Sequence, residues 1–376
     1  MKKIYLSSPT IHGEEQQFVK EAFDRNWIAP VGFNIDAFEA EVGDYINATS
    51  PDKFLPLALD SGTSSLHLAY KLAGIKQGTP VFVSDSTYCA TAFPITYEGG
   101  IPIFIDSERD SWNMDPEALE KAFRIHPEVK HVCLVHLFGT AAKVDIIKDI
   151  CDRHGAVLIE DAAEALGSYY KGRHCGTFGK YNAISFNGNK IITSSSGGML
   201  LAPNNEEWNR AFKYATQSRE PVSWFEHHDI GYNYRLSNVC AGIGRGQLLH
   251  LEEHRQAKKH IYETYKAGFA DLPVTMNPIP AGCDPNYWLS CVLIDRGVDV
   301  KPLTVLDRMR EKANAEGRPI WKPMSLQEVY EGSETVSVED YPVGYDLFDR
   351  GLCLPSDIKM TEEDMQLIIE AVRSCF

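Results

Sequence analysis

Short apolar runs alternate with stretches of helical periodicity from Phe54 onward. The runs lie at 54–59, 80–83, 101–106, 131–135, 156–159, 183–186 and 198–201. Strands that read as continuous apolar runs are typical of a parallel sheet that helices cover on both faces. The pattern therefore predicts an α/β fold built on a mostly parallel sheet.

The pattern at the two ends of the chain differs from this alternation. Two helices, 14–26 and 34–47, are expected before it, and one long helix, 238–269, after it. Beyond Pro273 the spacing predicts strands at 287–293 and 352–354 and helices at 303–315 and 362–373. We therefore expect two units. Residues 1–250 would form an N-terminal arm and a large domain, and residues 251–376 a smaller α+β domain, with the boundary inside the long helix.

Composition narrows the possible partners. The chain has 376 residues and a net charge of −15, from 37 Lys and Arg against 52 Asp and Glu. Nucleic acids and anionic membranes prefer a basic face, so we expect neither as a partner. The nine cysteines contain no C-x-x-C pair, and we expect no metal site. With no signal peptide or membrane-length apolar span evident, and with free thiols, the sequence suggests a cytoplasmic protein.

Lys190 is the first candidate for chemistry. It ends the stretch SFNGNK (185–190), which follows an apolar strand. A lysine amine can form a Schiff base with a carbonyl compound when it is neutral. A lysine after an Asn-Gly turn is more often a solvated loop cation. The choice between this interpretation and a Schiff-base lysine therefore depends on the polar clusters nearby in the fold. In an α/β sheet such clusters gather at the carboxyl ends of the strands.

Other segments could complete a cofactor site. The stretch DSGTSS (60–65) lies between a strand and a helix, where it could bind a phosphate or simply cap the helix. Asp161 ends a strand beside small residues, where a carboxylate could keep a pyridine nitrogen protonated or cap a helix. Tyr88 could stack on a planar ring or pack in the core. The glycines of 242–246 resemble a dinucleotide fingerprint only loosely, and close helix packing explains them better.

Taken in order, the motifs resemble one known family. They are SGTSSLHLA, STYCATA, HLFGTAA, IEDAAEALGSYYKGRHCGTFG, SFNGNK, IGYNYRLSNVCAGIGRGQL, RPIWKPM and GLCLPS. This series resembles the DegT/DnrJ/EryC1/StrS family of pyridoxal phosphate-dependent nucleotide-sugar aminotransferases, and the resemblance runs from Trp27 to Pro355. Within the family it is most similar to the enzymes that aminate C4 of UDP-linked 4-keto-6-deoxy-N-acetylhexosamines, as in the bacillosamine pathway.

The resemblance implies a fold, a cofactor and a set of roles. It implies the type I (aspartate aminotransferase-like) fold and pyridoxal 5′-phosphate. Lys190 would hold the cofactor and then act as acid and base, Asp161 would pair with the pyridine nitrogen, and Glu164 would lie near the ring oxygen. The remaining contacts would be Thr63, Ser64 and Ser185 with the phosphate, Tyr88 with the ring, and Asn233 reaching the phosphate from a neighbouring subunit. The last role implies a homodimer with shared sites.

The implied reaction transfers the amine of L-glutamate to the keto sugar. Cationic side chains would bind the nucleotide diphosphate, although each could equally be a surface cation; the candidates are Arg219, Arg318 and Lys322. His228, with its neighbour His227, could lie near the sugar or be merely exposed, and Trp27 could close over the nucleotide or simply pack. Ser325 replaces a histidine that is usual in the family, which leaves the substrate contacts open.

Several alternatives remain open on the sequence. The substrate could be another keto sugar, GDP- or dTDP-linked and aminated at C3 or C4. The related sugar 3-dehydratases carry histidine at the Schiff-base position, so Lys190 argues against them. A regulatory protein that binds pyridoxal phosphate without catalysis is the last alternative, and the full set of site residues argues against it.

Overall fold

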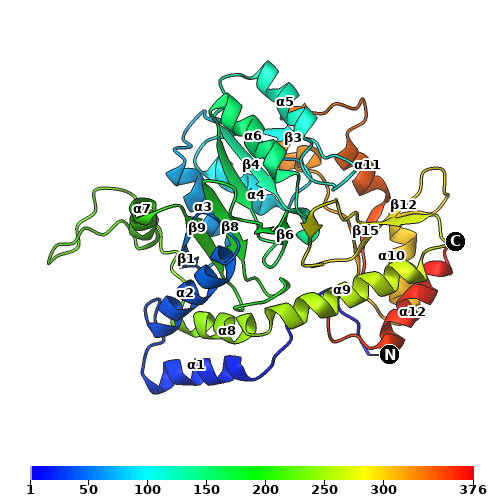
Figure 1. Cartoon of the computed structure of the whole chain (residues 1–376), viewed down its shortest axis with the longest axis horizontal. Helices are drawn as coiled ribbons and strands as arrows, with labels where there is room; N and C mark the ends of the chain where they lie inside the picture. The colour runs from blue at the N-terminus through cyan, green and yellow to red at the C-terminus, as the bar shows by residue number, and fades with distance from the viewer. Residues whose placement is uncertain (1) are drawn as a thin grey trace.

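One large sheet organises the chain. The computed structural model describes residues 2–376, and eight strands pair in the order β1-β9-β8-β5-β4-β2-β3-β14 (Figure 1). Only β9 runs antiparallel to its neighbours β1 and β8. The strands are β1 (Leu55–Leu59), β2 (Pro80–Ser84), β3 (Ile101–Ile105), β4 (His131–Val135), β5 (Val157–Asp161), β8 (Tyr181–Ser185), β9 (Gly198–Ala202) and β14 (Thr335–Val336).

Helices cover both faces of this sheet, as the apolar runs predicted. Side chains of α5 and α6 enclose one core with the sheet, and those of α3, α4 and α7 enclose another on the opposite face. The helices of this domain are α1 (Glu14–Asp24), α2 (Phe33–Asn47), α3 (Gly62–Leu72), α4 (Cys89–Tyr97), α5 (Pro116–Ile125), α6 (Val144–His154), α7 (Asn205–Ala215) and α8 (Asn238–Leu248). A short 3₁₀ turn, η1 (Leu137–Gly139), follows β4.

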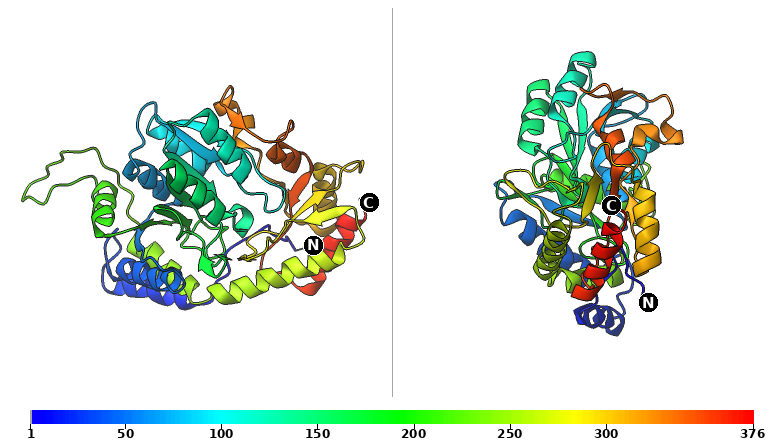
Figure 2. Two further views of the ribbon diagram at one scale, coloured as in Figure 1. Left: turned by 45° about the horizontal axis from the view of Figure 1, so that its top comes forward. Right: turned by 90° about the vertical axis from the view of Figure 1, so that its right-hand side faces the viewer.

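A smaller α+β domain stands beside the large one (Figure 2). Its sheet has the order β10-β12-β15-β13 and packs with the last helices around a core of its own. The elements are α9 (Leu251–Gly268), β10 (Val274–Met276), β12 (Cys291–Ile294), α10 (Pro302–Ala313), β13 (Arg318–Pro319), α11 (Val343–Arg350), β15 (Gly351–Cys353) and α12 (Glu362–Arg373). A three-stranded sheet of β11 (Cys283–Asp284), β6 (Tyr169–Tyr170) and β7 (Arg173–His174) adjoins both domains.

The expected boundary at residue 250 lies between two helices rather than inside one. The predicted helix 238–269 is interrupted, because α8 ends at Leu248 and α9 begins at Leu251. Two segments cross between the units. Ile4, from the N-terminal arm, packs in the core of the small domain, and β14 returns to the edge of the large sheet after the turns η2 (Met324–Leu326) and η3 (Glu328–Tyr330).

Close packing accounts for the glycines of α8. A Cβ on Gly244 would lie 2.6 Å from the Phe38 ring of α2, and one on Gly246 would lie 2.5 Å from the backbone of Glu15 in α1. The segment is a helix with no strand before it, so it is not a dinucleotide loop. Within residues 2–376, no helix combines the length and the apolar character that crossing a membrane needs.

Candidate active site

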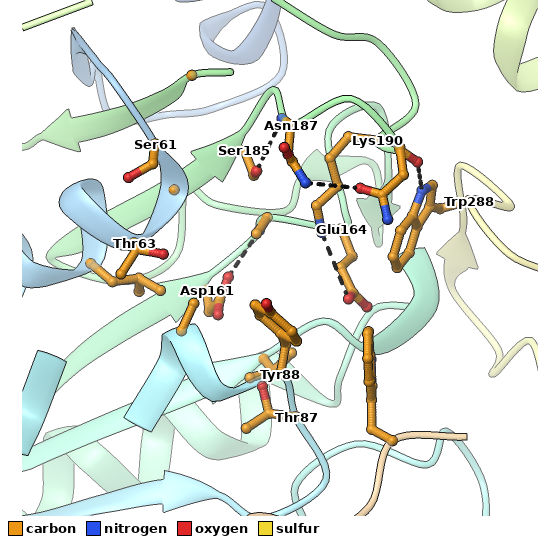
Figure 3. Close-up of a pocket in the computed structure, with 18 of the residues that line it drawn as sticks. Ser61, Thr63, Thr87, Tyr88, Asp161, Glu164, Ser185, Asn187, Lys190 and Trp288 are labelled. Atoms are coloured by element: carbon orange, nitrogen blue, oxygen red, sulfur yellow. Dashed lines mark hydrogen bonds and ion pairs between the residues drawn. The ribbon is translucent and has the colours of Figure 1, made fainter. Parts of the chain in front are cut away.

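A cavity of about 400 Å³ opens at the carboxyl ends of the parallel strands, against the small domain. The large domain supplies the residues that follow β1, β2, β5 and β8, and the small domain adds two tryptophans and an arginine. Figure 3 shows a close-up of the cavity and the side chains that line it. The residues that matter below are Ser61, Thr63, Tyr88, Asp161, Glu164, Ser185, Lys190, Trp288, Arg318 and Trp321.

The first turn of α3 forms one end of the cavity. Ser61 is its N-cap, and the Ser61 hydroxyl accepts the Ser64 backbone N–H at 3.1 Å. A Cβ on Gly62 would lie 3.0 Å from the Cβ of Ser185, and a Cβ on Gly198 would lie 2.3 Å from the carbonyl of Ser61. Gly198 is thus required for this close approach of strand and helix, and Gly62 has little room for a larger side chain. A helix N-terminus lined by hydroxyls binds an anion well, which suits a phosphate group.

The predicted phosphate contacts differ in their placement. Thr63 and Ser185 line the cavity. Ser64 is buried, and its hydroxyl donates to Asp60 Oδ1 at 2.5 Å, so the Ser64 side chain is held beneath the first turn of the helix and away from the cavity. Its phosphate role stays a prediction. Ser61, which belongs to the same predicted stretch, both caps α3 and lines the cavity.

Asp161 lies at the carboxyl end of β5, at the centre of the cavity. Thr91 donates its hydroxyl to Asp161 Oδ2 at 2.6 Å, and the Ala163 N–H donates to Oδ1 at 3.0 Å. These bonds orient the carboxylate. Burial raises the pKa of Asp161 although the Thr91 hydrogen bond opposes the rise. Among residues 2–376 no cation forms an ion pair with Asp161, and a buried carboxylate of this kind is suited to receive a positively charged ring nitrogen.

Lys190 lies at the other side of the cavity, between Glu164 and Trp288. Its Nζ is 3.8 Å from Glu164 Oε1 and 4.3 Å from the centre of the Trp288 ring. Burial lowers the pKa of Lys190, and the charge of Arg318 lowers it further, against the opposing effect of Glu164 and Asp161. The environment therefore favours the neutral amine that a Schiff-base lysine needs.

Glu164 comes from the turn after β5. Its Oε2 accepts the Phe138 backbone N–H at 2.7 Å. Burial raises the pKa of Glu164, and the charge of Lys190 opposes the rise. The two groups thus face each other in the cavity, and burial disfavours the ionised form of each.

Two aromatic side chains form the outer wall. Tyr88, directly before α4, is 52% exposed, and its ring centre lies 5.2 Å from that of Trp321. A ring that is half exposed over a cavity can cover a planar ligand. This placement suits the stacking role predicted for Tyr88.

The predicted substrate residues are scattered. Only Arg318 lines the cavity; Lys322 is exposed and lines a neighbouring pocket of about 320 Å³. Trp27 is 47% exposed beyond the end of α1. Arg219, His227, His228 and Asn233 belong to an exposed segment, 216–233, that projects from the body after α7 (Figures 1 and 2). The single chain does not bring these residues to its own cavity.

Sequence reasoning missed the contribution of Trp288. It placed this residue inside a strand, whereas β12 begins only at Cys291 and the Trp288 indole turns toward the lysine loop. The Trp288 Nε1–H donates to the Asn189 carbonyl at 2.7 Å. Neither the spacing nor the local pattern of residues marks such a contact between segments far apart in the chain.

These residues fit pyridoxal phosphate. The anion-binding helix end lies on one side of the cavity, the lysine lies on the other, and Asp161 is between them (Figure 3). This arrangement matches the phosphate, the aldehyde carbon and the ring nitrogen of the cofactor in turn. Fold and site together define the class of pyridoxal phosphate-dependent aminotransferases with the type I fold.

Comparison with known proteins gives the family. A model of the DegT/DnrJ/EryC1/StrS aminotransferase family matches residues 9–373. EpsN of Bacillus subtilis (strain 168), named as a pyridoxal phosphate-dependent aminotransferase, is 42% identical over 381 residues, covering 100% of this chain and 96% of EpsN. GDP-perosamine synthase of Vibrio cholerae is 30% identical over 373 residues, covering 99% of each chain. The crystal structure of the aminotransferase TlmJ from Streptoalloteichus hindustanus matches with a TM-score of 0.88 at 26% identity, covering 99% of this chain and 98% of TlmJ.

The chain belongs to the DegT/DnrJ/EryC1/StrS aminotransferase family. It is a pyridoxal phosphate-dependent sugar aminotransferase, and the predicted fold, enzyme class and cofactor are confirmed.

Proposed function

We propose that the protein transfers the amino group of L-glutamate to C4 of a nucleotide-linked 4-keto-6-deoxy sugar, specifically UDP-2-acetamido-4-keto-2,4,6-trideoxyhexose. The observation that carries the proposal is the buried Lys190 amine, 3.8 Å from Glu164 in the cavity at the strand ends. A neutral lysine in this position can move a proton at a substrate carbon. The choice of a UDP-linked acetamido sugar is supported by the resemblance of the motifs that begin at Tyr170, Ser185 and Ile230.

Each residue of the site would have a separate role in this reaction. Pyridoxal phosphate, when bound, supplies the electron sink that lets an amine pass between carbons. Thr63 and Ser185, with the amides at the start of α3, would hold its phosphate, and Asp161 would keep its ring nitrogen protonated. Glu164 would lie near the ring oxygen. Lys190 would anchor the cofactor and then carry the proton between the donor and acceptor carbons, in a cavity whose burial favours its neutral form.

A panel of substrates tests the reaction. The purified enzyme, pyridoxal phosphate and L-glutamate are mixed with UDP-, GDP- and dTDP-linked 4-keto and 3-keto sugars, and 2-oxoglutarate and the amino sugar are measured by mass spectrometry. We expect the 4-amino product from the UDP-linked 4-keto sugar. Lys190→Ala is the control and should form no product; ready turnover by this variant would remove the role given to Lys190.

A GDP-linked 4-keto sugar is the second candidate. It is favoured by the 30% identity to GDP-perosamine synthase over 99% of the chain. Product formation from the GDP-linked sugar alone would establish this candidate in place of the first.

We also propose a homodimer in the cytoplasm, in which Asn233 reaches the partner's site. The projecting segment 216–233 supports this, because it exposes 63% of Trp224, 77% of Phe225 and 85% of Ile230. Apolar side chains this exposed usually lie in an interface. The nine cysteines are all free, which suits a reducing compartment.

Hybrid dimers test the shared site. Lys190→Ala and Asn233→Ala subunits, each poorly active alone, should regain activity when mixed and reassembled, because one of the two sites then carries neither change. A mixture no more active than its parts would contradict the sharing. The mass of the intact assembly in solution, measured by light scattering, gives the oligomeric state independently.

A further inference from the structure

Arg318 is a half-buried cation that lines the cavity, and two of its guanidinium nitrogens lack a hydrogen-bond partner. It lies in β13, and its Nε and Nη2 are buried without a hydrogen-bond acceptor. Its guanidinium carbon lies over the Trp321 ring, 3.7 Å from the ring centre. The indole thus supports the guanidinium in the cavity, and its Nε–H and Nη2–H groups have no acceptor among the described residues.

Guanidinium donors that are buried without an acceptor are costly. Removing them from water is unfavourable unless an anion compensates the charge. Glu164 accepts the Phe138 N–H and lies beside Lys190, and it forms no ion pair with Arg318. Among residues 2–376 no carboxylate forms an ion pair with Arg318. The structure thus has a planar cation ready for an anionic ligand.

Three anions could enter this cavity. The cofactor's phosphate has its own cradle at Ser61 and Thr63, across the cavity from Glu164 and Lys190 (Figure 3). The diphosphate of a nucleotide sugar is separated from the reacting C4 by the sugar ring. The carboxylate of an amino donor is bonded to the carbon that gives up the amine.

Proximity to the reacting lysine favours the carboxylate. Arg318 lines the same cavity as Lys190 and Glu164, so its guanidinium lies near the point where the amine would be transferred. Burial lowers the pKa of Lys190, and the charge of Arg318 lowers it further. A guanidinium also binds a carboxylate through two parallel hydrogen bonds. We propose that Arg318, stacked on Trp321, binds a carboxylate of the amino-acid donor and leaves the sugar diphosphate to other residues. This inference rests on the proposed function, and it changes the role that the sequence suggested for Arg318.

The test separates the two halves of the reaction. Wild type, Arg318→Gln and Arg318→Lys are loaded with pyridoxal phosphate, and the loss of its visible absorbance is followed by stopped flow against L-glutamate concentration. The return of the absorbance is then followed with the keto sugar. Arg310→Gln is the matched control, since Arg310 is 72% exposed on α10. Circular dichroism confirms that each variant is folded.

We expect Arg318→Gln to raise the glutamate concentration for half-maximal rate by about 10- to 100-fold, the usual effect of losing a charged hydrogen bond. The rate of the half-reaction with the keto sugar should change less than about threefold, which is the scatter among variants that lose no contact. Arg318→Lys should recover part of the loss, because lysine restores the charge but not the two parallel N–H donors of a guanidinium. Calorimetry with glutarate, which cannot react, should show binding to wild type and little to Arg318→Gln.

Opposite outcomes overturn the inference. A defect confined to the sugar half would assign Arg318 to the diphosphate, and weaker binding of pyridoxal phosphate itself would assign it to the cofactor. Equal glutarate binding by wild type and Arg318→Gln, or none by either, would also count against it. Failure of the proposed function looks different, because glutamate would then leave the absorbance of the wild type unchanged.

Discussion

Asp85 couples the stability of the protein to pH. It directly follows β2 and is fully buried. Its two oxygens accept the Ser325 N–H at 2.8 Å and the Ser325 hydroxyl at 2.6 Å. Burial, with a smaller contribution from the charge of Asp106, raises the pKa of Asp85 to about 6 from 3.8, although the bonds from Ser325 oppose the rise.

The direction of the pH effect follows from the two pKa values. The folded protein keeps a proton on Asp85 up to about pH 6, whereas the unfolded chain releases it near pH 3.8. The folded state therefore binds more protons in this window. The contribution of Asp85 is most favourable below pH 3.8 and is lost as the pH rises through 6. The difference between the two values corresponds to about 3 kcal/mol.

Asp85→Asn measures this contribution. Asparagine is neutral at every pH, and its amide oxygen can still accept the Ser325 N–H while its NH2 group donates to the Ser325 hydroxyl, so the variant should gain stability relative to wild type as the pH rises from 4 to 7.5. Urea unfolding at several pH values gives the difference in free energy, and we expect it to grow by up to about 3 kcal/mol. The exposed Asp152→Asn serves as the control. A difference that stays constant over this range would refute the reasoning, and so would one that shrinks.

Three further predictions follow from individual contacts. Gly198→Ala would place a Cβ 2.3 Å from the Ser61 carbonyl and should weaken binding of pyridoxal phosphate by at least about 10-fold, measured by fluorescence titration. Glu160→Gln should cost about 3 kcal/mol in urea unfolding at neutral pH. Burial opposes the ionised form, but hydrogen bonds from His136 and backbone amides lower the pKa of Glu160, and its stabilisation should fade as the pH falls through that value. Trp288→Phe, which loses the bond to Asn189 but keeps an aromatic ring, should retain more activity than Trp288→Leu; equal activities would show that the ring face is unimportant.

The local sequence pattern was enough to predict much of the large domain's fold and the residues at the centre of the candidate site. Apolar runs identified the main strands of the large sheet because a strand buried on both faces has a simple pattern. Asp161 and Lys190 could be placed at strand ends for the same reason. The motif series added the family, since it preserves the order and the spacing of these segments. The sequence pattern did not predict β14, which has only two residues, or α7, which adjoins a polar loop.

Contacts between segments that are far apart in the sequence became evident only in the tertiary structure. Trp288 and Arg318 reach the cavity from the small domain, and no local pattern specifies a contact across so many residues. The break between α8 and α9 and the turning of the Ser64 hydroxyl toward Asp60 likewise depend on packing and on competing hydrogen bonds. The sequence by itself determined that Asp161 ends a strand and that Lys190 follows one, because strand and motif are local. Only the folded chain brought Arg318 of the small domain into the same cavity as Lys190, because that depends on how two separate cores meet.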